Sequence, residues 1–112
     1  MDRGKSLIIP HLFDGTNYAY WKVRMRAFLQ SLDEKVWQAV EIGWTEPKEA
    51  SADWDEAKIK AANFHSRALN ALFSAVTNEE FKKISSTETA KEAWTILQTT
   101  YEGTKAVKDS KL

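Results

Sequence analysis

The side chains of this chain that could do chemistry are few and scattered. It contains no cysteine and only two histidines, His11 and His65. The missing cysteines exclude disulfides, thiolate catalysis and every metal site that needs a thiolate ligand. The two imidazoles lie far apart in the sequence and show no His-Glu-x-x-His spacing, so they indicate no zinc site. A packed or surface role on a helix is the better interpretation of His65.

Two pairs of adjacent carboxylates could act as general acid and base. Asp33 with Glu34, and Glu79 with Glu80, each stand where a helix is expected to begin, and the helix dipole favours acidic side chains there. Residues 13–16 read Phe-Asp-Gly-Thr, whereas aspartic proteases carry their hydroxyl residue before the glycine. No glycine-rich phosphate loop is present. We therefore expect no enzyme, with no catalytic residue, bound metal or cofactor.

Basic and aromatic residues alternate in one segment, a pattern that can indicate contact with nucleic acid. Lys22 and Arg26 are one helical turn apart, but Arg24 points to roughly the opposite side of a helix. The whole chain has 16 basic and 16 acidic residues and a formal net charge of zero. We expect a solvated basic flank here, and RNA binding that is weak and sensitive to salt.

The elements that position these residues belong to one small domain. The chain has 112 residues, of which 43% are apolar and 29% charged, as in ordinary globular domains. No apolar run approaches the ~20 residues that cross a bilayer, and no signal-peptide core follows the N-terminus. We expect no membrane partner and a cytoplasmic location, with the nucleus as the alternative.

Apolar residues at helical spacing predict an all-α fold, a small bundle of about five to six helices. The predicted core consists of residues on the apolar stripes, namely Trp21, Trp54, Phe64, Leu72, Trp94 and Leu97. Asp53 and Glu56 resemble a capping box at the start of a long central helix. Asn17, Asn78 and Thr89 are the expected caps of three others. The expected helices cover residues 17–32, 33–42, 53–76, 78–84, 89–102 and 105–112.

The N-terminal segment is expected to be an extended arm. Residues 7–10 read Leu-Ile-Ile-Pro, a short β-branched run that ends in proline. Residues 1–16 then form the arm and a turn, and residues 17–112 form the helical domain, one domain overall. Such an arm could pair with an incoming strand.

Trp44 stands apart from the apolar stripes. It follows Gly43, a good helix stop, and lies in a connection, where side chains are usually at the surface. It either folds back to cap the bundle or contributes to an interface. The candidate interaction residues are Leu7, Ile8, Ile9, Pro10, Tyr20 and Trp44.

Charge is distributed unevenly along the chain. Residues 1–32 carry five basic and two acidic groups, residues 33–57 carry two basic and eight acidic groups, and residues 58–112 carry nine basic and six acidic groups. The acidic middle is either a solvated connection or a surface for a basic partner, and the first is the commoner case.

Several short motifs appear in a fixed order. The first spans residues 12–18, Leu-Phe-Asp-Gly-Thr-Asn-Tyr, and the last spans residues 89–94, Thr-Ala-Lys-Glu-Ala-Trp. In their order and intervals they resemble the Gag polyprotein of copia-type LTR retrotransposons from plants, over roughly residues 7–112. The other matching residues are Trp21, Met25, Leu29, Trp37, Val40, Gly43, Pro47, Trp54, Leu97, Tyr101, Glu102 and Gly103.

This resemblance implies a structural protein with a fold like the N-terminal lobe of a retroviral capsid. Such lobes self-associate in the lattice of a virus-like particle around the RNA of the element. The chain has no Cys-Cys-His-Cys zinc knuckle, which usually gives Gag its RNA specificity. The alternative is a domesticated, Gag-derived adaptor lobe that binds a peptide of a partner protein.

Overall fold

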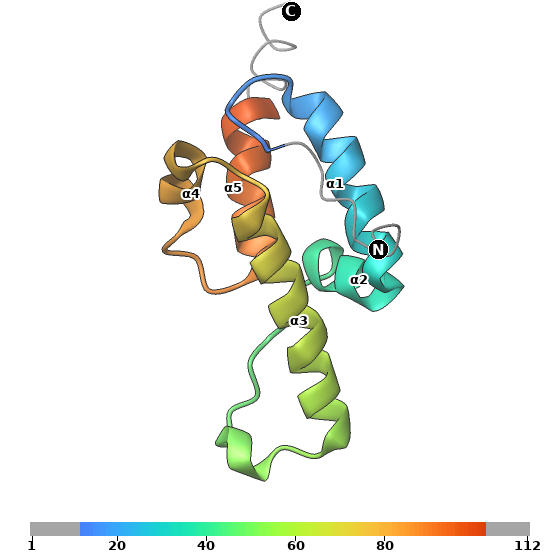
Figure 1. The fold of residues 1–112 in the computed structure, drawn as a ribbon. Coiled ribbons are helices and arrows are strands. Elements are labelled where there is room, and N and C mark those ends of the chain that lie inside the picture. Colours follow the sequence, from blue (N-terminus) through green and yellow to red (C-terminus); the bar gives the residue numbers. More distant parts are fainter. Residues whose placement is uncertain (1–11, 103–112) are drawn as a thin grey trace, which may run out of the picture.

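Five α-helices form the architecture of residues 12–102 (Figure 1). The structure, a computed structural model, describes residues 12–102, so the arm at 7–10 and the helix expected at 105–112 lie outside the described residues. The all-α prediction is confirmed. Within 12–102 there is no β-strand, only an isolated bridge between Phe13 and Val76. The elements are α1 (Tyr18–Leu32), α2 (Glu34–Glu41), the 3₁₀ turn η2 (Ser51–Asp53), α3 (Glu56–Ser74), α4 (Asn78–Ile84) and α5 (Ala90–Glu102).

The core lies where α1, α2, α5 and the C-terminal half of α3 meet. Trp94 on α5 contacts Trp21 on α1 and Trp37 on α2, with ring centroids 5.9 and 5.3 Å apart. Of the predicted core residues, Trp21, Trp94, Leu72 and Leu97 are buried, as expected. Helical spacing therefore identified the stripes that meet in the interior.

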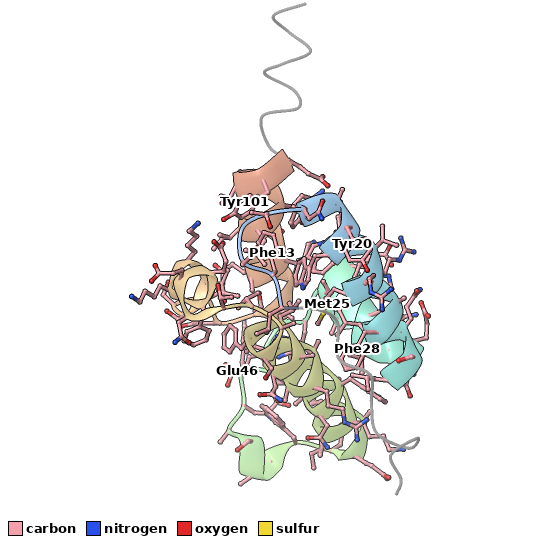
Figure 2. The ribbon with its side chains drawn as sticks, turned by 45° about the horizontal axis from the view of Figure 1, so that its top comes forward. Phe13, Tyr20, Met25, Phe28, Glu46 and Tyr101 are labelled. Carbon is pink, nitrogen blue, oxygen red and sulfur yellow. The ribbon has the colours of Figure 1, made fainter. Side chains whose placement is uncertain are left out.

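Phe13 is a central core residue, although the sequence placed it in a turn. Its ring is fully buried and lies 5.0 Å from Trp21 and 4.9 Å from Tyr101, centroid to centroid. Its N–H donates to the carbonyl of Ala75 (2.9 Å), and its carbonyl accepts from the N–H of Thr77 (3.0 Å). These two backbone bonds hold the N-terminal segment against the end of α3 (Figure 2).

The first half of α3 projects away from the other helices, whereas the sequence predicted a central helix throughout (Figure 1). Ala57 and Ala61 are exposed, and the buried part of α3 begins at His65. Phe64, a predicted core residue, is only half-buried and packs against the edge of the core. The small side chains of Ala57 and Ala61 would allow a neighbouring helix to approach closely, but no other described helix covers this half of α3.

The predicted start of this helix was wrong by two residues. Asp55, not Asp53, is the N-cap, and its carboxylate accepts from the N–H of Lys58 (2.9 Å). Trp54 precedes the helix and is half-buried, so its assignment to the core was also wrong. Its Nε1 donates to the carbonyl of Glu49 (2.9 Å) and folds the connection onto itself.

Other helix ends lie at the positions that the sequence predicted. Thr89 Oγ1 accepts from the N–H of Glu92 (3.1 Å), the first bond of a capping box. The carboxylate of Glu92 accepts from the N–H of Glu88 (3.1 Å), one residue before the cap. Gly43 ends α2 with φ of 106°, a conformation that favours glycine. Asn17 is the N-cap of α1 but makes no side-chain cap bond.

The expected cap of α4 was misplaced by one residue. Thr77 occupies the N-cap position, and Asn78, the predicted cap, is already the first residue of the helix. Thr77 makes no side-chain cap bond there. The backbone N–H of Thr77 donates to the carbonyl of Phe13, and this bond ties the start of α4 to the segment that precedes α1.

Candidate functional site

One cluster of titratable side chains forms where α4 meets the end of α5. The hydroxyl of Tyr101 donates to Glu80 Oε1 (2.6 Å), and the ammonium of Lys83 donates to the Tyr101 oxygen (2.8 Å) and to Glu80 Oε2 (3.2 Å). Glu80 is only 4% exposed. The sequence placed Glu80 at a helix start but missed this burial, because the partner Tyr101 is distant in the chain.

The electrostatics of this cluster favour a structural role. Burial and the bond to Glu80 raise the pKa of Tyr101, and the bonds to Tyr101 and Glu80 raise the pKa of Lys83. Tyrosine therefore stays neutral and lysine stays charged, so neither is prepared to act as a base or nucleophile. Gly15 covers the cluster with φ of 98°, and a Cβ there would lie 3.0 Å from Glu80 Oε2.

His65 is buried on α3, with 4% of its surface exposed. Its Nε2 accepts a hydrogen bond from the N–H of Ala90 (2.9 Å), the first residue of α5. Its ring stacks on Trp44, with centroids 4.4 Å apart and planes inclined by 16°. Burial lowers the pKa of His65. The packed role expected for His65 agrees with this geometry, which joins α3, α5 and the connection after α2.

No group of three or more His, Asp or Glu side chains gathers as a metal would require anywhere in residues 12–102. Over the same residues, every helix is too short or too polar to cross a lipid bilayer. The remaining candidates are surfaces that could contact other macromolecules.

A groove of about 340 Å³ separates α2 from the projecting half of α3. Trp44 forms one wall, Ala57 and Ala61 lie along α3, and the charged lining residues are Lys35 and Lys60. Trp44 is thus half-buried, with one face on His65 and the rest beside the groove. This position favours the fold-back alternative, although an interface role for Trp44 stays a prediction.

Replacing Trp44 by serine separates these two roles. We expect Trp44→Ser to melt lower as a monomer, because the variant loses the stacked pair with His65, worth about 0.5–1.5 kcal/mol beyond area burial. Circular dichroism and sedimentation provide the two readouts. Loss of association with an unchanged melting temperature would instead identify Trp44 as an interface residue.

A second groove, of about 510 Å³, runs between α1, α2 and α5. The buried rings of Trp37 and Trp94 contribute to its lining, and Arg26 lies over the Trp37 ring, 4.9 Å from its centroid. The Nε1 of Trp37 is a buried donor with no hydrogen-bond partner among the described residues. Lys22 lies along the same groove and forms an ion pair with Glu102 (3.1 Å).

Tyr20 lies on the outward side of α1 and is 52% exposed (Figure 2). Arg24 lies above its ring, 5.5 Å from the centroid, and Val23 beside them is 68% exposed. Lys22 and Arg26 are directed to the groove instead, so the basic residues divide between two sides of α1 as predicted. The candidate residues Tyr20 and Trp44 therefore belong to different surfaces, and Leu7 to Pro10 lie outside the described residues.

Together, the fold and these surfaces describe an all-helical domain whose described residues offer grooves and an exposed helix face. Residues 13–41 match a family described as "Domain of unknown function (DUF4219)". The matched range begins at Phe13 and ends with α2, so it contains the aromatic anchors Trp21 and Trp37. Comparisons with curated proteins and with solved structures returned no match.

Proposed function

We propose that this chain is a structural Gag domain of a copia-type LTR retrotransposon, a capsid lobe that self-associates during assembly of a virus-like particle. The observation that carries the proposal is the DUF4219 match over residues 13–41, since this domain is found in Gag-like retrotransposon proteins. The motifs of the plant copia-type Gag resemblance overlap that range and continue to Gly103. The all-α fold agrees with a capsid lobe.

Self-association is the property to test. Sedimentation velocity at rising concentration should reveal reversible oligomers of this domain. Electron microscopy of a longer protein that carries a second lobe should show closed shells. A domain that stays monomeric at every concentration, in a longer protein that forms no particles, would refute the capsid role.

A second candidate function is a peptide-binding adaptor. The groove between α1, α2 and α5 supports it, because the rings of Trp37 and Trp94 contribute to its lining beside Lys22 and Arg26. A strictly monomeric domain that captures hydrophobic peptides would favour the adaptor.

Binding to RNA is expected to be weak for this domain. The chain has no net charge, and Lys22 and Arg26 are occupied by Glu102 and Trp37. Any binding of a single-stranded RNA oligonucleotide should fall steeply with added salt, because phosphate contacts release counterions. Fluorescence anisotropy at low and high salt measures this. Tight binding that survives high salt would contradict the expectation and restore the basic helix as a functional site.

A further inference from the structure

We propose that copies of this chain associate head to tail, with the outward face of α1 in one copy receiving the acidic tip of the next. The α1 face is defined here as Tyr20, Val23, Arg24 and Ala27. The acidic tip is residues 46–56, the connection that leads into α3. This inference rests on the proposed self-association and names the two surfaces that would make it.

The α1 face is an exposed, apolar and basic strip. Tyr20, Val23, Arg24 and Ala27 are spaced three or four residues apart, so they lie on one side of the helix. All four are exposed. Arg24 is the basic residue of this face, and helix α1 has no acidic residue. Large exposed apolar side chains beside an arginine are typical of contact surfaces.

The acidic tip is the complementary surface. Residues 46–56 contain five acidic side chains and one basic side chain, Lys48. Glu49 pairs with Lys58, and Asp55 caps α3. Glu46 and Asp53 are exposed and make no ion pair among the described residues.

The two surfaces cannot meet within one chain. The 3₁₀ turn of the tip lies at the far end of the molecule, beyond the projecting half of α3, and Glu46 lies nearer the bundle; the α1 face lies on the side of the bundle (Figures 1 and 2). A contact between them must therefore join two copies. Because different patches meet, the contact is heterologous, and repetition produces a ring or an open chain, as a lattice requires.

RNA is a poorer occupant of the α1 face. Only Arg24 among the three basic residues of α1 belongs to this face, since Lys22 and Arg26 lie along the adjoining groove, which Val23 borders. One guanidinium gives little of the phosphate neutralisation on which RNA affinity depends. The uneven charge of the chain supplies an acidic partner surface instead.

Charge exchange tests the contact. Arg24→Glu on the face and Glu46→Lys with Asp53→Lys on the tip should each weaken self-association by roughly tenfold or more, as like charges then meet. An equimolar mixture of the two variants should restore association, because each supplies the surface that the other lacks. Sedimentation velocity measures all three samples. Wild-type association should also weaken at about 1 M salt, where the Debye length is about 3 Å.

Matched controls separate the contact from general charge effects. Lys82→Glu on α4 changes the net charge as Arg24→Glu does, and Lys82 is exposed and lies outside both surfaces. It should associate as the wild type does, and circular dichroism should show all variants folded.

Several outcomes would overturn the proposal. Wild-type association that is insensitive to both sets of changes would place the interface elsewhere and leave the capsid role intact. Failure of the mixture to restore association would exclude this pairing of surfaces. If Arg24→Glu abolished binding of an RNA oligonucleotide and left self-association unchanged, the α1 face would be an RNA site. A monomeric wild type whose longer form makes no shells would refute both the contact and the proposed function.

Discussion

Replacing Trp94 by alanine is expected to leave the domain largely unfolded. Trp94 is 7% exposed and joins α5 to α1 and α2 through its contacts with Trp21 and Trp37. Truncation of a buried tryptophan typically costs about 3–5 kcal/mol, a large share of the roughly 5–15 kcal/mol that stabilises a small domain. Thermal unfolding followed by circular dichroism measures the loss.

Tyr20→Ala is the matched control for this experiment. Tyr20 is also an aromatic residue of the bundle, but it is half exposed and lies outside the buried core cluster. Its replacement should change the melting temperature by little. A Trp94→Ala variant that melted like the wild type would show that Trp94 is not a core residue.

Acidification is expected to destabilise the domain through His65. In the folded state, Nε2 must be unprotonated to accept from the N–H of Ala90, and a charged imidazole would also face the positive end of the α5 dipole. Burial lowers the pKa of His65 in the folded state below its value in the unfolded chain, about 6.5. The unfolded state therefore binds more protons as the pH falls below about 6.5.

The expected pH dependence follows from that difference. The contribution of His65 to the free energy of unfolding is complete above about pH 6.5. It declines as the pH falls from there to the lowered pKa of His65 in the folded state. In model peptides aspartate and glutamate titrate at about pH 4 and histidine at about pH 6.5, so the window between pH 7.5 and 5.5 reports chiefly on histidine. We expect the melting temperature to drop by several degrees across it, since a domain of this size loses about 4–8 °C per kcal/mol.

His65→Gln tests the assignment. A glutamine oxygen can accept from Ala90 but does not titrate, so the slope of melting temperature against pH should flatten in this variant. His11→Gln is the control for the other imidazole and should keep the slope. Equal slopes for the wild type and His65→Gln would show that His65 does not cause the pH dependence.

Local patterns predicted much of the fold because short-range forces determine helix spacing and caps. The stripe through Trp21, Met25 and Leu29 predicted α1, and the Thr89–Glu92 box predicted the start of α5. The predictions failed where two similar local signals competed. Asp53 and Asp55 are both plausible caps, and the 3₁₀ turn at Ser51–Asp53 leaves the second one at the helix start.

The candidate surfaces were predictable only in part. The exposure of Tyr20 and the division of the basic residues follow from helix geometry. The stack of Trp44 on His65 does not, because it joins residues from separate elements. The acidic middle of the chain was visible as a charge pattern, but the projection of its second half, with the 3₁₀ turn at Ser51–Asp53, beyond the bundle is a property of the folded chain (Figure 1).

Residue types and their spacing were enough to predict the helical class, the apolar stripes of α1 and α5, the uneven charge and the lack of cysteine chemistry. These properties depend on one element at a time, and the geometry of a helix converts spacing directly into faces. The packing of the helices, in contrast, places Phe13 in the core, buries Glu80 beneath Gly15 and lets His65 tie α3 to α5. Each of these depends on contacts between residues far apart in the chain, whose pairing arises when the helices pack.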